Sequence, residues 1–319
     1  MDMAQRQELA REAVGQVGQM IFGKPQEIRE VLLAILADGH ILLEDIPGVG
    51  KTTLALAFSK TLGLDYHRVQ FTPDVMPSDL TGFSIYRRDQ EKFVYQPGSV
   101  FCNLLLADEL NRTSPKTQSA LLEVMEERRV TVEGVTREVP KPFLVIATQN
   151  PSGAAGTQRI PEAQMDRFLI SLSLGYPDFE SELTMARAVD GTNQLDRLRP
   201  VLTREELLDI QAEIHQVFIS EAVYRYLVAL VSATRRHPTL ERGASPRATI
   251  ALVKLARASA WYQGRAFVTP EDVSAQFPYA VAHRVLPGLA ARMEREELAQ
   301  LLDEIARSVK KPSLQEAGR

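Results

Sequence analysis

The chain has 319 residues, of which 45% are hydrophobic and 24% are charged, and its formal net charge at pH 7 is −4. The hydrophobic fraction is large enough for a packed core, which excludes a disordered chain, and the length predicts two domains at roughly 150 residues each. The slightly acidic balance argues against a protein built mainly to coat nucleic acid. The single cysteine, Cys102, cannot form an internal disulfide framework and fits a reducing compartment.

No segment contains the run of about 18 apolar residues that a membrane-spanning helix needs. The first residues, MDMAQRQELAREAVGQ, are polar and helix-like, and they lack the apolar stretch of a signal peptide. We therefore expect a cytoplasmic protein with no membrane insertion.

The first part of the chain, residues 1–177, alternates short apolar runs with helical and turn-rich segments. Short apolar runs separated by long connections predict a buried parallel sheet of the α/β type, because a tight hairpin cannot join parallel strands. The expected strands are Ile41–Glu44, Tyr66–Phe71, Asn103–Ala107, Phe143–Thr148 and Phe168–Leu174.

Two stretches within this first part predict β-hairpins. Phe83–Gln96 has apolar and aromatic arms around a polar turn, and Val130–Val139 has valine and threonine arms around Glu133-Gly134. Neither pair of arms is apolar enough for a central strand, so we expect both hairpins to project from the core.

The second part, residues 178–319, predicts a helical domain, with the boundary near Gly175–Asp178. Thr203-Arg-Glu-Glu forms a capping box before apolar residues at helical spacing, and Thr269-Pro-Glu-Asp repeats this start signal. Ser220 is expected to cap a further helix, and Ser245-Pro246 places a cap and a first-turn proline before another.

The strongest motif lies between the expected strand Ile41–Glu44 and a predicted helix over Thr52–Leu62. Asp45-Ile-Pro-Gly-Val-Gly-Lys-Thr matches the phosphate loop G-x-x-x-x-G-K-[ST], except that Asp45 replaces the first glycine. The two glycines let backbone N–H groups converge on phosphate oxygens, and the helix adds its positive end. Lys51 is expected to neutralise the phosphates and Thr52 to bind Mg²⁺. The predicted cofactor-binding residues here are Asp45, Pro47, Gly48, Val49, Gly50, Lys51, Thr52 and Thr53.

Acidic and amide side chains follow two further apolar runs. Asp108 and Glu109 end the run Leu104–Ala107, and Asn150 follows Phe143–Thr148. At the edge of the sheet where a phosphate loop opens, Asp108 is expected to hold Mg²⁺ and Glu109 to polarise the attacking water. Asn150 is expected to orient that water or to sense the γ-phosphate.

Other chemistries find little support. The histidines at 40, 67, 215, 237 and 283 are scattered and lack the spacing of a metal site. The chain contains no G-x-S-x-G nucleophile motif, and Cys102 starts a predicted buried strand, where a thiol is usually inert.

The combination and order of these motifs resemble those of the AAA+ ATPases, and the detailed sequence of the motifs resembles the MoxR family. The stretches that carry this resemblance are LLEDIPGVGKT, LLADELNRTSPKTQSALLEVMEE, ATQNP, PEAQMDRF and GASPRA, in that order, between about Ile21 and Arg292. The resemblance implies a fold with a five-stranded parallel sheet and a smaller, all-α C-terminal lid.

The resemblance also implies roles for individual residues. Asp108 and Glu109 match the Walker B acids, and Asn150 matches sensor 1. Arg167 matches the arginine finger, which reaches the ATP of a neighbouring subunit. Arg247 matches sensor 2 from the lid, and it is expected to bind the nucleotide and to stabilise charge on the transferring phosphate together with Lys51 and Mg²⁺. Arg247 also lies in the first turn of a helix, where its charge opposes the helix dipole unless an anion is bound.

Three further assignments concern the adenine contact, the two hairpins and the subunit interface. Ile21, Phe22 and Gly23 precede the sheet where such proteins contact adenine. The hairpins match the helix-2 insert and the pre-sensor-1 hairpin. Arg112, which follows Glu109, and Arg159, near the finger, are candidates for assisting Arg167 at a subunit interface.

The resemblance implies an ATP-hydrolysing, Mg²⁺-dependent motor in a homo-oligomeric ring, most often a hexamer. It suggests a chaperone-like role toward protein clients, commonly with a von Willebrand factor A-domain partner. Three alternatives stay open: a nucleotide-dependent switch or scaffold with little turnover, a DNA-remodelling protein, and a subunit of a metal-chelatase motor.

Overall fold

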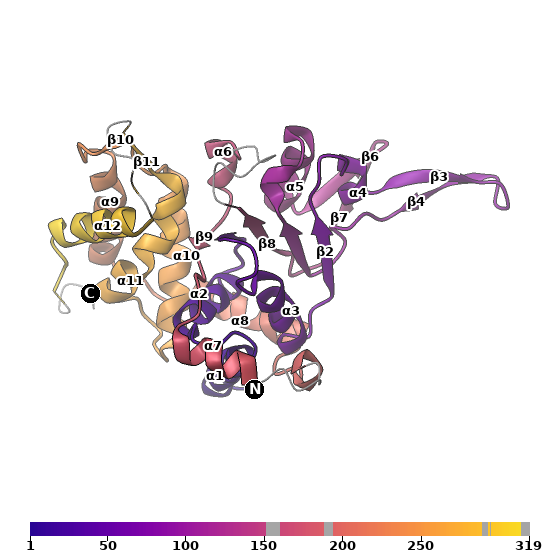
Figure 1. Ribbon diagram of the computed structural model, residues 1–319. Coiled ribbons are helices and arrows are strands. Elements are labelled where there is room, and N and C mark those ends of the chain that lie inside the picture. The colour runs from indigo at the N-terminus through magenta and orange to yellow at the C-terminus, as the bar shows by residue number, and fades with distance from the viewer. Residues whose placement is uncertain (151–159, 188–193, 289–292, 294, 314–319) are drawn as a thin grey trace.

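The computed structural model describes residues 1–150, 160–187, 194–288, 293 and 295–313. Its centre is a parallel five-stranded sheet in the order β2-β5-β8-β1-β9 (Figure 1). The strands are β1 (Ile41–Glu44), β2 (Tyr66–Gln70), β5 (Leu104–Asp108), β8 (Leu144–Gln149) and β9 (Ile170–Leu172). The five expected strands are all present, and β1 has the predicted bounds.

Small differences at the strand ends have local causes. Strand β5 begins at Leu104, one residue later than expected, and Asn103 just before it bonds the neighbouring segment: its side-chain amide donates to the Pro142 carbonyl, and its backbone carbonyl accepts from the N–H of Leu144. Phe168 is still part of a turn, because its N–H donates to the Met165 carbonyl. The apolar run at 168–174 is therefore longer than the strand it contains.

The sheet is buried on both faces because alternate strand residues enter two different hydrophobic clusters. Ile41 and Leu43 of β1 pack with helices α1–α3, while Leu42 packs on the opposite face with α5. This arrangement explains why the strands read as continuous apolar runs. The helices are α1 (Met3–Gly18), α2 (Pro25–Leu36), α3 (Lys51–Thr61), α4 (Pro77–Thr81), α5 (Pro115–Glu127) and α6 (Glu162–Met165), with a 3₁₀ turn η1 at Leu110–Arg112.

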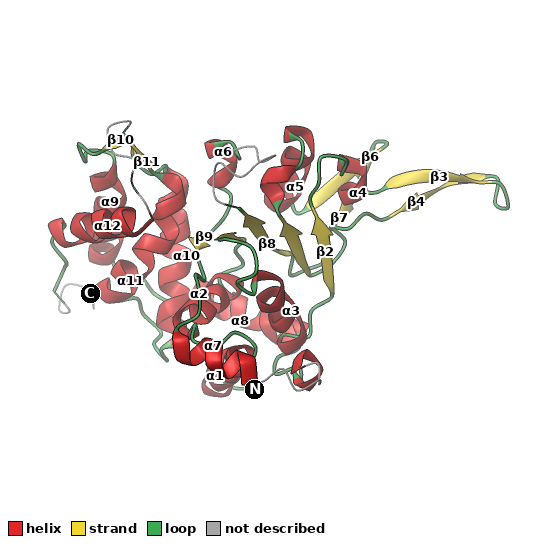
Figure 2. Ribbon diagram, in the orientation of Figure 1, coloured by secondary structure: helices red, strands yellow, loops and turns green. Residues whose placement is uncertain are grey.

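Both predicted hairpins are confirmed. The strands β3 (Phe83–Arg87) and β4 (Lys92–Gln96) form a long arm that extends away from the body of the protein (Figures 1 and 2), and β6 (Arg129–Val132) pairs with β7 (Val135–Glu138). The hairpins contact each other: the Arg137 guanidinium lies 3.7 Å from the centre of the Tyr95 ring, and Ser84 donates to Glu133. One cation–π contact and one hydrogen bond thus join the two hairpins.

The C-terminal half is helical, as expected, with one short antiparallel pair that the periodicity did not indicate. The four predicted caps are confirmed: Thr203, Ser220, Ser245 and Thr269 each accept a hydrogen bond from the first turn of their helix. The elements are α7 (Phe179–Arg187), η2 (Gln194–Arg197), α8 (Arg204–Gln216), α9 (Glu221–Thr234), β10 (Leu240–Arg242), α10 (Pro246–Tyr262), α11 (Pro270–Val281), η3 (Ala282–Arg284), β11 (Leu286–Pro287) and α12 (Arg295–Ser308).

The two halves share one hydrophobic cluster. It includes buried residues of α1, α2 and α3 together with residues of α8, α10 and α11. Helix α10 contacts both α1 and α2, so the C-terminal helices pack directly against the sheet domain. Within the described ranges, no helix is long and apolar enough to cross a membrane.

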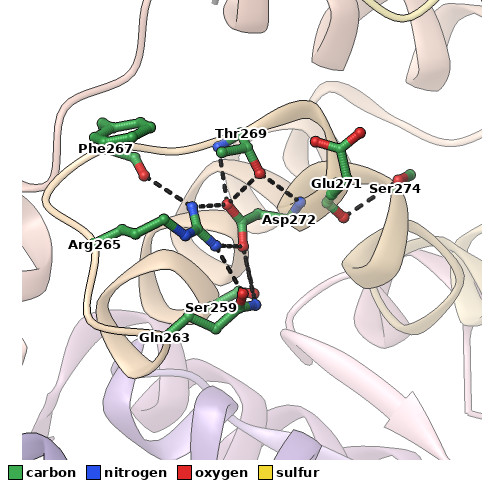
Figure 3. Close-up of polar contacts among 8 residues, drawn as sticks. All are labelled: Ser259, Gln263, Arg265, Phe267, Thr269, Glu271, Asp272 and Ser274. Atoms are coloured by element: carbon green, nitrogen blue, oxygen red, sulfur yellow. Dashed lines mark hydrogen bonds and ion pairs between the residues drawn. The ribbon is translucent and has the colours of Figure 1, made fainter. Parts of the chain in front are cut away.

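A buried ion pair fixes the start of α11 (Figure 3). The Asp272 side chain is fully buried, and its two oxygens accept hydrogen bonds from both terminal nitrogens of Arg265, at 2.6 and 2.7 Å. Ser259, Gln263 and Thr269 donate to the same carboxylate. All of these contacts lie within the helical half, which indicates a structural role.

We expect Asp272→Ala to lower the free energy of unfolding by about 3 kcal/mol, since it leaves a partly buried guanidinium without its partner. Urea unfolding followed by the fluorescence of Trp261, the single tryptophan, measures this change. The control is Glu271→Ala, whose side chain is 66% exposed and points away from the cluster (Figure 3). A shift of the same size in both variants would contradict the assignment.

Candidate functional site

The loop between β1 and α3 has the backbone that a phosphate loop requires. Gly48 and Gly50 have φ angles of 88° and 94°, which residues with a Cβ atom rarely adopt. Gly50 is the residue that caps α3, and a Cβ placed on Gly48 would meet no atom within 4 Å. The first N–H groups of this eleven-residue helix have no acceptor within the helix, which is the feature that binds phosphate at the start of a helix.

Lys51 lies in the first turn of α3, inside this loop. Its Nζ donates to the carbonyl oxygens of Asp45 at 2.6 Å and Ile46 at 3.2 Å. Burial lowers the pKa of Lys51, while the nearby carboxylates of Asp45, Asp108 and Glu109 partly offset this by raising it. The lysine is thus held by main-chain acceptors at the position from which it would meet an anion.

Asp108 ends β5 next to the loop. Its Oδ1 accepts a hydrogen bond from Thr148 at 2.7 Å, and its Oδ2 pairs with Arg68 of β2, also at 2.7 Å. The Asp108 side chain is only 11% exposed. Thr148 also accepts a hydrogen bond from the N–H of Glu109, so the end of β8 orients both acids.

Glu109 is held in place by three donors. Gln70, Arg112 and Asn150 donate to its carboxylate at 2.8, 2.7 and 3.0 Å. Burial raises the pKa of Glu109, but these hydrogen bonds lower it by more, so its net pKa lies below the ordinary value. The backbone at Glu109 has φ 57°, a strained conformation for a residue with a side chain, and such strain concentrates at functional sites.

These side chains surround one cavity of ≈ 390 Å³. It is lined by Pro47, Gly48, Gly50, Lys51, Thr52, Thr53, Arg68, Gln70, Asp108, Glu109 and Asn150. A hydroxyl and a carboxylate, Thr52 and Asp108, face this space, and oxygen ligands of this kind suit Mg²⁺ accompanied by water and phosphate oxygens. The donor set fits a triphosphate with its magnesium ion. Among the described residues, no cluster of three or more His, Cys, Asp or Glu offers a separate metal site.

Some predicted binding residues lie outside the cavity. The carboxylate of Asp45 turns toward the end of β9, where it accepts from Ser173 and from the N–H of Leu174 and Gly175. It therefore anchors the loop, and Val49 packs against the hydrophobic core. Of the three residues predicted beside adenine, Ile21 lies against Gly50, because a Cβ on that glycine would come 3.3 Å from it. Phe22 and Gly23 follow directly, and Gly23 has φ 71° and sits against Ser181.

Arg167 and Arg247 lie elsewhere. Both pair with Glu126 near the end of α5, at 2.7 and 2.5 Å. They line a second cavity of ≈ 330 Å³ together with Asp38, Gly39 and His40, which precede β1. The phosphate loop follows β1, so the two cavities lie at opposite ends of this strand. The structure thus groups Lys51, Thr52, Asp108, Glu109 and Asn150 in one site and the two arginines in another.

Several residues of these sites escaped prediction. Arg68 and Gln70 alternate with apolar residues in β2 and read as ordinary exposed strand positions, and Glu126 is one of several acids near the end of α5. Arg112 was expected near a subunit interface, and the structure shows it bonded to Glu109. Arg159 lies outside the described residues.

The fold and the first cavity together define a P-loop nucleotide-binding protein with a helical lid. Residues 40–170 match the model of the ATPase family associated with various cellular activities (AAA), and residues 232–305 match the AAA lid domain. The crystal structure of a candidate ATPase from Cytophaga hutchinsonii superposes with a TM-score of 0.89 at 38% identity, covering 98% of this chain and 97% of that one.

Three similar proteins indicate which family of AAA+ ATPases the chain belongs to. Chaperone MoxR1 of Mycobacterium tuberculosis is 40% identical over 86% of this chain and 74% of its own length. Protein MoxR of Methylorubrum extorquens is 32% identical over 92% of this chain and 91% of its own. YeaC of Bacillus subtilis is 43% identical over 98% of this chain and 97% of its own. The chain belongs to the MoxR family of AAA+ ATPases, which confirms the resemblance seen in the motifs.

We expect Lys51→Ala to weaken ATP binding about 10- to 100-fold, because a charge-assisted hydrogen bond to phosphate contributes about 1.5–3 kcal/mol. Titration with a fluorescent ATP analogue measures the affinity. Lys60→Ala is the matched control, since Lys60 lies on the same helix but pairs with Asp196. Unchanged affinity in Lys51→Ala would show that the nucleotide binds elsewhere.

Proposed function

We propose that this protein is a Mg²⁺-dependent ATPase that works as a ring and remodels protein clients. The observation that carries the proposal is the convergence of Lys51, Thr52 and the two acids Asp108 and Glu109 in one cavity at the carboxyl ends of β1 and β5. Membership of an ATPase family supports hydrolysis, and the name of the mycobacterial relative supports a chaperone-like role.

Each residue of the cavity has a distinct task in this proposal. The loop amides and Lys51 hold the phosphates, and Thr52 and Asp108 hold the magnesium ion, which neutralises charge on the phosphate oxygens. Arg68 now pairs with Asp108 and would release it when the metal binds. Glu109 accepts a proton from the attacking water, and Asn150 orients the carboxylate or the water.

The position of the arginines supports an active site shared between subunits. Arg167 and Arg247 lie at the opposite end of β1 from the phosphate loop of their own chain. In a ring, one subunit can present this end to the nucleotide of its neighbour. An arginine supplied in trans increases phosphoryl transfer about 10³- to 10⁵-fold in other systems.

The exposed side chains of the β3–β4 arm support contact with a protein client. Phe93 is 70% exposed, and Phe83, Ile85 and Tyr86 are also exposed along the same hairpin. Apolar groups on a projecting arm suit a transient protein surface better than a phosphate backbone. A partner of the von Willebrand factor A type remains an expectation from the family resemblance.

The alternatives differ in what they require of this site. A switch or scaffold would bind ATP but turn over little of it, so its activity would hardly change in Glu109→Gln. A DNA-remodelling protein would show salt-dependent binding to DNA, and a metal-chelatase subunit would stimulate insertion of a metal into a porphyrin. The acid at the tip of the β6–β7 hairpin, Glu133, disfavours DNA.

The first test is ATP turnover per subunit over a wide range of protein concentration, with Mg²⁺ present. We expect a cooperative rise in the rate per subunit, because the arginines must come from a neighbour, and we expect Arg167→Ala to lose about 10³-fold in rate.

Glu109→Gln should bind ATP and turn it over at least about 100-fold more slowly than the wild type. Normal turnover by either variant would remove that residue from the mechanism.

A pH profile tests the environment of Glu109. The rate should fall as the pH drops through the pKa of Glu109, because the protonated carboxyl cannot accept a proton. Arg112→Ala removes a cation that favours the ionised form, so this pKa rises and the acid limb moves to higher pH. Arg129→Ala is the control, since Arg129 pairs with Glu127. An unmoved limb would mean that another group governs the profile.

A further inference from the structure

One carboxylate collects two arginines from two different parts of the fold. Glu126 lies near the end of α5 in the sheet domain, Arg167 follows α6 and precedes β9, and Arg247 lies in the first turn of α10 in the lid. Arg167 binds Oε2 of Glu126 and Arg247 binds Oε1, so each oxygen serves one guanidinium.

These contacts leave further guanidinium nitrogens of both arginines available as hydrogen-bond donors. Arg167 uses Nε, which lies at the base of its guanidinium, and Arg247 uses a single terminal nitrogen. Within the described part of the chain, no other side-chain hydrogen bond holds either guanidinium. The Nη1 and Nη2 fork of Arg167 is thus free to bind phosphate oxygens while Nε stays on Glu126.

The neighbouring acid is already engaged. Asp166 pairs with Arg284, which is 2% exposed, and accepts a hydrogen bond from Ser245 at the cap of α10. The adjacent residues Asp166 and Arg167 are therefore not an ion pair. Because two guanidinium groups at one site repel each other, the charge of Glu126 is what allows them to stay together.

We propose that Glu126 is a positioning residue that holds Arg167 and Arg247 as a pair and presents both to the triphosphate of a neighbouring subunit. The inference rests on the proposed function, in which these arginines act in trans. It adds that the lid arginine and the sheet-domain arginine act as one unit, so their alignment depends on the position of the lid relative to α5.

The matched variants are Glu126→Gln and Glu127→Gln. Glu127 is the next residue of α5, its side chain is 48% exposed, and it pairs with Arg129. We expect Glu126→Gln to lower kcat at least about tenfold, with the KM for ATP changed by less than about twofold, because its own phosphate loop is untouched. Glu127→Gln should retain the wild-type rate.

Two combinations distinguish positioning from simple support of the fold. Adding Glu126→Gln to the double variant Arg167→Ala/Arg247→Ala should cause no further loss, since both arginines that Glu126 holds are already absent. Mixing Glu126→Gln subunits with Glu109→Gln subunits should restore turnover, because the second variant supplies intact arginines to the intact catalytic sites of the first. A carboxylate that served only its own subunit would not be rescued.

The outcomes separate the two proposals. If Arg167→Ala keeps its rate, the shared active site itself is wrong. If Arg167→Ala loses turnover but Glu126→Gln keeps it, only the role of Glu126 is wrong. Thermal unfolding midpoints of both glutamine variants should lie within about 2 °C of the wild type, since Glu126 is a partly exposed surface residue. If the Glu126→Gln midpoint falls, rescue in the mixed rings supports the role and its absence overturns it.

Discussion

The parallel pairing of β1, β5 and β8 is the constraint on which the site depends. In this register Leu106 lies beside Ile146, which in turn lies beside Ile41, so the three strands end together at one edge of the sheet. Each strand end carries a different polar element: the phosphate loop, the acids Asp108 and Glu109, and Asn150. A shift of one residue in any strand would turn these side chains to the other face and bury them in an apolar cluster.

The same edge also shows how the acids are prepared for different tasks. Arg68 and Thr148 each hold one oxygen of Asp108, whereas Glu109 accepts three hydrogen bonds and has a lowered pKa. A carboxylate held so firmly is a weak base. In the proposed mechanism, loss of one of these partners on nucleotide binding or assembly would raise the pKa of Glu109 and make it a stronger base.

The lid contacts the sheet domain through both apolar and polar side chains. It shares a hydrophobic cluster with α1 and α2, and its polar contacts with the sheet domain include those of Arg247 with Glu126, Arg284 with Asp166 and Gln276 with Glu30. Helix α5 begins after the turn η1 that follows the two acids, Glu126 lies near its end, and the β6–β7 hairpin follows directly. The hairpin in turn touches the β3–β4 arm through Arg137 and Tyr95. A continuous set of contacts therefore joins the two arginines, helix α5 and the projecting arm.

Much of this protein could be predicted from its sequence because local physics determined it. The β1 run, the glycines of the phosphate loop, the helix caps and the two hairpins depend on side-chain periodicity and turn chemistry within a few residues. Motif order was enough to indicate the family. What only the tertiary structure decided are pairings between distant segments: Arg68 with Asp108, Gln70 with Glu109, and Arg247 with Glu126 rather than with the phosphate loop of its own chain. These pairings depend on the order of the strands and on the position of the lid relative to the sheet domain. A local sequence pattern contains no information about the distance between residues 126 and 247.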